Sequence, residues 1–178
     1  KTSAGDSDVF LTKITTTEQL RKIGDAAGLT FKDSEGTNLS STGTTDTNPT
    51  VYIYDQDNET LLATIAVDLS EDRDWSSLSG DSDTGEYKMF INGAIGAPGA
   101  NTSMTLYVPK NEGDNAVVLC PGVESLLDVS KTCANKRTLT AHDTDVSTSE
   151  ISGIDYWVIA NVTDQKIGGM SVGFPGVS

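Results

Sequence analysis

Short runs of β-branched and aromatic residues recur along the chain, and turn-forming residues separate them at regular intervals. The clearest two runs, 50–54 and 60–67, flank a polar pentapeptide and predict a β-hairpin. About nine or ten such runs, joined by loops rich in Gly, Ser, Thr and Asp, are typical of two packed antiparallel sheets. We therefore expect a mainly β fold, a β-sandwich of jelly-roll or immunoglobulin-like type. The length predicts a single domain over residues 1–178.

The other predicted strands are dense in β-branched residues or alternate between apolar and polar side chains. They cover 8–15, 29–32, 86–92, 103–108, 116–120, 137–140, 154–163 and 170–174. A short turn joins 103–108 to 116–120, so these two runs are predicted to pair as a hairpin. The most hydrophobic run, 154–163, is predicted to be central.

Two polar segments, 69–85 and 142–153, are predicted to be loops rather than strands. Trp75 and Leu78 interrupt the first of them and are expected to anchor it to the core. One short helix is predicted over residues 17–27. A capping-box spacing lies at its start, apolar residues then repeat at helical intervals, and glycine follows its end.

The chain has two cysteines, Cys120 and Cys133, on either side of a compact segment that begins with Pro121. A disulfide between them would close a loop whose entropy contributes roughly 3 kcal/mol to stability. Two buried free thiols are the alternative. The spacing lacks the Cys-x-x-Cys pattern and the histidine partners of a zinc site, which favours the disulfide and an extracellular setting.

The net charge of −14, from 26 acidic and 12 basic residues, excludes binding to nucleic acid and to anionic membranes. No apolar run reaches the roughly 18 residues that a membrane-spanning helix needs. Lys1 is expected to be a mature N-terminus left after processing of an extracellular protein. An acidic intracellular protein of a salt-adapted organism is the alternative.

Catalysis is not predicted, because the chain lacks a recognisable catalytic set. His142 is the only histidine, it lies in a polar stretch, and no Gly-x-Ser-x-Gly motif accompanies it. Acidic residues are so frequent that no pair can be singled out for glycoside hydrolysis. We therefore expect a protein that is not an enzyme and requires no cofactor, with a secreted hydrolase as a distant alternative.

Calcium is a candidate cation, because acidic residues alternate in two turns. The oxygen ligands would come from Asp55, Asp57 and Glu59 in the first turn and from Asp81 and Asp83 in the second. Neither turn is an EF-hand, since the twelfth position lacks the required glutamate. Solvated turn acids are the alternative interpretation.

Four Asn-x-Ser/Thr patterns are candidate glycosylation sites. Asn38, Asn58 and Asn101 fall in predicted loops or turns, where a glycan has room. Asn161 is expected to end a buried strand, which makes it a poorer acceptor.

The runs 105–110, 118–122 through Cys133, 139–140 and 156–158 resemble β-domains of large surface proteins and adhesins of archaea and uncultivated bacteria. The resemblance covers about residues 104–163. It implies an extracellular surface or filament role on a β-sandwich scaffold, and it transfers no site residue beyond the cysteine pair.

These observations predict a secreted structural subunit that assembles with copies of itself into a filament, pilus or surface layer. An extended segment given to the open sheet edge of a neighbour would hold the copies together. Val9, Phe10, Leu11 and Ile14 are the candidate donor residues, and the C-terminal run 170–174 is the second candidate. In the alternative, both are ordinary strands of their own domain. A secreted carbohydrate-binding or adhesin module is the second function, although few aromatic residues are present to serve it.

Overall fold

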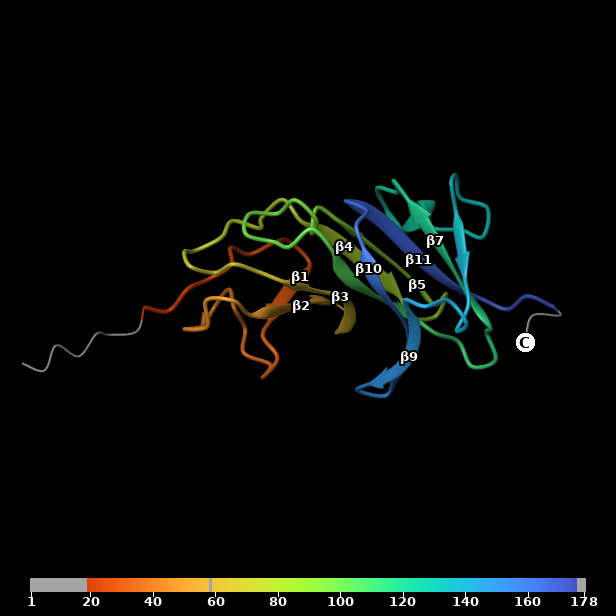
Figure 1. Cartoon of the computed structure of the whole chain (residues 1–178), viewed down its shortest axis with the longest axis horizontal. Coiled ribbons are helices and arrows are strands. Elements are labelled where there is room, and N and C mark those ends of the chain that lie inside the picture. The colour runs from red at the N-terminus through yellow and green to blue at the C-terminus, as the bar shows by residue number, and fades with distance from the viewer. Residues whose placement is uncertain (1–18, 58, 176–178) are drawn as a thin grey trace, which may run out of the picture.

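The computed structural model describes residues 19–57 and 59–175, which form two antiparallel sheets packed face to face (Figure 1). Almost all regular structure is β, so the predicted β-sandwich is confirmed. The described helical structure is one 3₁₀ turn, η1 (Leu126–Asp128). The predicted strand 8–15, which contains the N-terminal donor residues, lies outside the described residues.

The first sheet has six strands. Their order across the sheet is β1 (Leu29–Lys32), β2 (Thr50–Asp55), β3 (Thr60–Ala66), β6 (Met104–Pro109), β10 (Ile154–Val162) and β9 (Val146–Ile151). The predicted hairpin is confirmed, since β2 and β3 pair antiparallel with Thr50 opposite Ala66 and Asp55 opposite Thr60. The strands β1 and β9 are the two edges of this sheet.

The second sheet has five strands. Their order is β4 (Ser79–Asp83), β5 (Lys88–Asn92), β11 (Lys166–Val172), β7 (Ala116–Pro121) and β8 (Arg137–Leu139). The C-terminal strand β11 is therefore the middle strand, paired with β5 on one side and β7 on the other. This placement makes the run 170–172 an ordinary strand of its own domain, as the alternative interpretation held.

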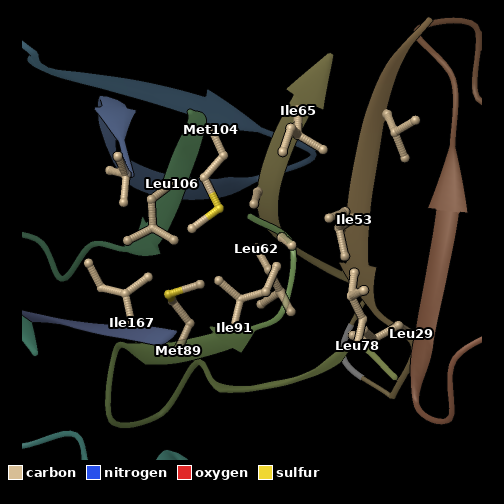
Figure 2. Packing of buried hydrophobic residues seen from close by; sticks show 14 of the residues in the cluster. Leu29, Ile53, Leu62, Ile65, Leu78, Met89, Ile91, Met104, Leu106 and Ile167 are labelled. Atoms are coloured by element: carbon tan, nitrogen blue, oxygen red, sulfur yellow. The ribbon is translucent and has the colours of Figure 1, made fainter. Parts of the chain in front are cut away.

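The core lies between the two sheets. Inward-facing apolar side chains of both sheets interdigitate there, among them Ile53, Leu62, Met89, Leu106 and Ile167 (Figure 2). Burial of this alternate set of side chains is the main favourable contribution to such a fold. Polar contacts also join the two sheets. Trp157 Nε1 of β10 donates to Ser171 Oγ of β11 at 3.0 Å, and Ser82 Oγ of β4 donates to Asp55 Oδ2 of β2 at 2.6 Å.

The predicted pairing of 103–108 with 116–120 is wrong, because the two strands belong to different sheets. In the structure β6 pairs with β3 and β10, whereas β7 pairs with β11 and β8. The connection 110–115 carries the chain from one sheet to the other. Every residue of both strands is buried or half-buried, so each strand needs partners on both sides, and a two-stranded hairpin would not provide them.

Both polar segments predicted as loops contain a strand. β4 lies within 69–85 and β9 within 142–153. Each pairs along its full length with an apolar neighbour, β5 or β10. Pairing with that neighbour stabilises the extended backbone, although the strand's own residues have a low β-propensity. The anchoring role is confirmed: Trp75 and Leu78 are buried, and the Trp75 ring packs edge-on against Phe31 at 5.3 Å.

The predicted helix over 17–27 is wrong in its described part, 19–27, where the chain is extended. Arg21 exchanges backbone hydrogen bonds with Thr44, and Gly24 N donates to Arg73 O at 2.7 Å. The loops on either side thus satisfy the backbone of this segment, and Gly24 lowers its helix propensity. The run 154–163 is also not central, since β10 lies one place from the edge of its sheet.

Candidate binding faces and open edge

The two outer faces of the sandwich differ in what lies over them. The outer face of the five-stranded sheet is beneath residues 122–133, and we call it the covered face. Val123 and Val129 of this segment pack on Phe90, Val118 and their neighbours as a second small apolar cluster. The cluster is separate from the main core, so the segment 122–133 buries apolar side chains of its own against this face.

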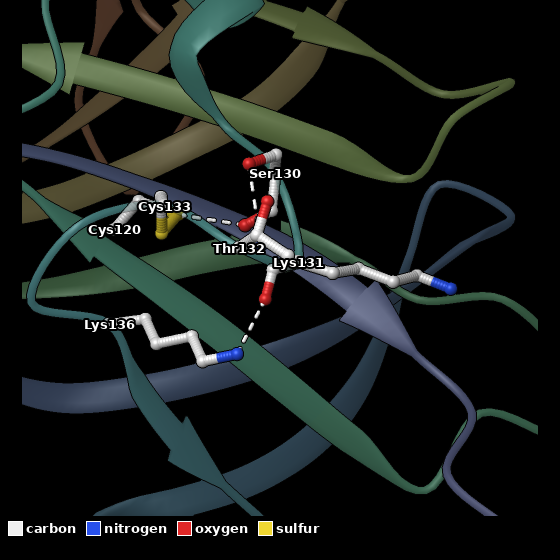
Figure 3. Close-up of a disulfide and its surroundings, with 6 residues drawn as sticks. All are labelled: Cys120, Ser130, Lys131, Thr132, Cys133 and Lys136. Atoms are coloured by element: carbon white, nitrogen blue, oxygen red, sulfur yellow. Dashed lines mark hydrogen bonds between the residues drawn. A yellow bond between two sulfur atoms is a disulfide. The ribbon is translucent and has the colours of Figure 1, made fainter.

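A disulfide closes the segment over the covered face (Figure 3). Cys120 of β7 is joined to Cys133, with Cα atoms 5.8 Å apart, so the predicted pairing is confirmed. Lys136 Nζ donates to Lys131 O at 2.7 Å, close to the Cys133 end of the loop. The described residues include no other cysteine.

Gly168 of β11 lets the disulfide loop approach the sheet closely. A Cβ atom at this position would lie 2.3 Å from Val129 Cγ2 and 3.0 Å from Met89 O. A real Cβ contact does not reach such distances, so any larger residue would push the loop away. The adjacent Gly169 does the same on the core side, where a Cβ atom would lie 2.4 Å from Val108 Cγ2.

The outer face of the six-stranded sheet carries four of the chain's five tyrosines, and we call it the tyrosine face. Its members are Tyr52, Tyr54, Tyr107 and Tyr156. Side chains alternate along a strand, and the neighbours of these tyrosines point into the core. Trp157, for example, reaches Ser171 of the other sheet, which directs Tyr156 to the opposite side.

Tyr156 is the buried, hydrogen-bonded tyrosine of the tyrosine face. Its side chain is 1% exposed, and its hydroxyl accepts a hydrogen bond from Leu61 N at 3.1 Å. Its ring meets that of Tyr107 edge-on, with centroids 6.0 Å apart. Burial raises the pKa of Tyr156, and the hydrogen bond from Leu61 opposes this in part.

Tyr54 borders a hollow of about 580 Å³ on this face. The walls of the hollow also include Lys32 of β1, Gln56 and Glu59 of the β2–β3 turn, Ser152 of the β9–β10 turn and Ile154 of β10. Lys32 Nζ lies 4.9 Å from the centroid of the Tyr54 ring. Burial raises the pKa of Tyr54, and the nearby Tyr52 and Tyr107 hydroxyls raise it further.

The edge strand β9 has an unusual exposure pattern for a sandwich strand. Ser147, Thr148, Ser149 and Glu150 are all exposed, although alternate residues of a sandwich strand ordinarily face the core. Ala160 N donates to Asp145 O, and hydrogen-bonded pairs alternate along an antiparallel ladder. The N–H groups of Thr148 and Glu150 therefore point away from β10, out of the sheet.

A groove of about 280 Å³ lies where β8 and β9 form neighbouring edges of the two sheets. Its apolar wall includes Leu119, Leu139, Val146 and Ile159. Polar groups of the connecting turn 143–145 line its rim. The groove thus combines an apolar floor with a nearby open sheet edge.

The opposite edges of the sheets are occupied by the chain itself. Leu39 N donates to Phe31 O on β1 at 2.9 Å, and Ser82 N on β4 donates to Asp55 Oδ2 at 3.0 Å. Such coverage is the ordinary protection of an edge strand. The β8–β9 side is therefore the more accessible side for another chain.

The two turns predicted to bind calcium lie side by side. Asp55, Asp57 and Asp81 line one hollow of about 520 Å³. Asp55 Oδ2 accepts from Ser82 N and Oγ, and Asp83 Oδ1 accepts from Gly85 N and Glu86 N. Within 19–57 and 59–175, no three His, Cys, Asp or Glu side chains are grouped as a metal site. Calcium binding, including a role for Glu59, stays a prediction.

The glycosylation candidates differ in exposure. Asn101 is exposed, and Asn38 is half-buried with its Oδ1 accepting from Ser40 N and Ser41 N at 2.9 Å. Asn161 is exposed as well, because a register shift in β10 turns it outward, in contrast to the expected burial. Asn58 lies outside the described residues. Modification of any of the four stays a prediction.

Besides the two tyrosines, two carboxylates have altered pKa values, and both lie in the surface loop before β4. Hydrogen bonds from Ser70 lower the pKa of Asp68, and hydrogen bonds from Ser76 lower that of Asp74. The side chains satisfy backbone N–H groups of tight turns, a common structural role for aspartate. His142 is exposed in the turn after β8.

The fold and the disulfide define the chain as an antiparallel β-sandwich with one disulfide-closed loop. No protein-family model, curated protein or solved structure matches it significantly. Among the residues that the structure describes, no helix is long and apolar enough to cross a membrane.

Proposed function

We propose that this chain is an extracellular structural subunit that assembles with copies of itself by donating an N-terminal strand to the open β9 edge of a neighbour. The disulfide and the acidic, Ser/Thr-rich composition support the extracellular setting. The surface layer, pilus or filament that results would be held by backbone hydrogen bonds between subunits.

The observation that carries this proposal is the exposure of β9. Both faces of residues 147–150 are exposed, and the N–H groups of Thr148 and Glu150 point out of the sheet. An added strand would pair with these groups and cover the inward side of β9. Without a partner, such an edge is an aggregation site.

The donor properties follow from the sequence of the N-terminal segment. Val9 and Leu11 would share one face of an extended strand, with Phe10 on the other. Side chains of this size suit the apolar floor of the groove beside β9. Ile14 would extend the apolar contact along the edge.

Truncation tests the donor. A chain lacking residues 1–14 should fold but form no polymers by electron microscopy and light scattering. A synthetic peptide of residues 1–14 should raise its Tm by binding the open edge. Unchanged polymerisation of the truncated chain would contradict donation of this segment, and so would unfolding of the monomer.

Substitution of an outward-pointing amide tests the acceptor. Thr148→Pro removes an N–H group that β10 does not use, and should block polymerisation while leaving the monomer folded. Thr148→Val keeps the N–H group and serves as the matched control. Equal polymerisation of both variants would show that the β9 edge is not the acceptor.

A further inference from the structure

Aromatic residues are scarce in this chain, and their distribution is uneven. Aromatics make up 6% of the sequence, yet four of five tyrosines gather on the outer face of one sheet. Three of them, Tyr52, Tyr54 and Tyr107, are partly exposed. A tyrosine side chain offers a rigid apolar ring and a hydroxyl at its tip, so this face can contact CH groups and hydroxyl groups together.

The rings of this face are held in place before any ligand arrives. The hydrogen bond from Leu61 N fixes the Tyr156 hydroxyl, and the Tyr156 ring contacts that of Tyr107. Lys32 Nζ holds one side of the Tyr54 ring. Rigid side chains lose little conformational entropy on binding, which favours affinity for a small ligand.

The hollow beside Tyr54 has the size of a small-ligand site. Its volume of about 580 Å³ falls in the range of roughly 300–1,000 Å³ that such sites occupy. It touches both β1–β2 and the β9–β10 turn. Strands β2 and β10 are three places apart in the sheet, so the hollow is lined by segments that are not direct neighbours.

The polar groups of the hollow suit a ligand that both donates and accepts hydrogen bonds. Lys32 donates, Glu59 accepts, and Gln56 and Ser152 can do both. The net charge of −14 and the carboxylate of Glu59 disfavour an anionic ligand. A purely apolar ligand would leave these polar groups without partners.

We propose that the hollow on the tyrosine face binds a neutral oligosaccharide. The Tyr54 ring would pack against the CH face of a sugar ring, and Lys32, Gln56 and Ser152 would bond its hydroxyl groups. This site uses other groups than the strand-donation edge, since β9 would contribute its outward amides at Thr148 and Glu150 to assembly, and neither residue lines the hollow.

Affinity electrophoresis of the full chain tests this proposal. The gels would contain hydroxyethylcellulose, xylan, galactomannan or laminarin as neutral polysaccharides, and alginate as the acidic one. At least one neutral polysaccharide should retard the protein, and alginate should not. Retardation by alginate alone, or by none of the five, would overturn the proposal.

Tyrosine variants locate the site. Tyr54→Ala should weaken binding of the retarding polysaccharide about tenfold, equivalent to about 1.4 kcal/mol. Tyr87→Ala is the matched control, because Tyr87 lies at the β4–β5 turn of the other sheet, and it should bind as the unmodified chain does. Equal binding by both variants would place the ligand elsewhere.

A second variant guards against misfolding of the first. Lys32→Met keeps the length of the side chain and removes the donor, so binding should weaken while Tm stays within a few degrees. Unchanged affinity in Lys32→Met together with unchanged affinity in Tyr54→Phe would show that the polar groups of the hollow play no part, which contradicts the proposed site.

Discussion

The covered face and the tyrosine face are the two outer surfaces of the same sandwich, yet they differ in what lies over them. Over the covered face it places a disulfide-closed loop and a small apolar cluster. On the tyrosine face, Tyr52, Tyr54 and Tyr107 are half-buried, and Tyr54 borders a polar hollow. One sheet is thus covered within the chain, whereas the other carries the hollow that we propose as a ligand site.

Loss of the disulfide should have the largest effect on this contrast. The double variant Cys120→Ser and Cys133→Ser opens the loop over the covered face and exposes its apolar cluster. The free energy of unfolding should fall by about 3 kcal/mol, measured by chemical denaturation. Binding at the tyrosine face should be unchanged in the folded variant. A similar loss at both faces would contradict their independence.

A smaller effect is expected from Gly168→Ala. The new Cβ atom would overlap Val129 Cγ2, so the loop must shift, at a cost of about 1–3 kcal/mol in unfolding free energy. Gly24→Ala is the control, since a Cβ atom there meets its nearest neighbours at 3.5 Å, an ordinary contact. Equal stability of the two variants would show that the loop does not rest on β11.

The smallest effect should appear at high pH on the tyrosine face. The pKa values of Tyr54 and Tyr156 are raised, mainly by burial. The unfolded chain therefore loses these protons first, at pH about 10, so the contribution of these two groups to stability is fully present below that pH and is lost as the pH rises above it. Between pH 8 and 11, the unfolding free energy of Tyr54→Phe should therefore fall less with rising pH than that of the unmodified chain, as measured by chemical denaturation at each pH. Identical pH dependence of the unfolding free energy in the two proteins would contradict a raised pKa of Tyr54.

The sequence predicted the sandwich and the disulfide because both depend on local patterns. Alternation and turn residues marked the β2–β3 hairpin, and the cysteine spacing marked the loop. It missed β4 and β9, whose pairing depends on apolar neighbours rather than on their own residues. It also predicted a helix where loops distant in sequence hold the segment extended.

The tyrosine face was only partly readable from the sequence. The i, i+2 spacing of Tyr52 and Tyr54 places them on one side of a strand. Tyr107 and Tyr156 join them only because β6 and β10 share this sheet, and the expected pairing of β6 with the strand at 116–120 assigned it to another partner. Which residues share a face thus depended on the order of the strands, which local patterns do not contain.

Hydroxyl-radical footprinting tests the contrast between the two faces most directly, because the radical reacts readily with exposed aromatic rings. In the oxidised protein, Tyr52, Tyr54 and Tyr107 should be modified, while Phe90, 7% exposed beneath the disulfide loop, should be protected. Reduction of the disulfide should expose Phe90 and leave the tyrosines unchanged. Protection of the tyrosines, or modification of Phe90 in the oxidised protein, would contradict the assignment of one covered and one open face.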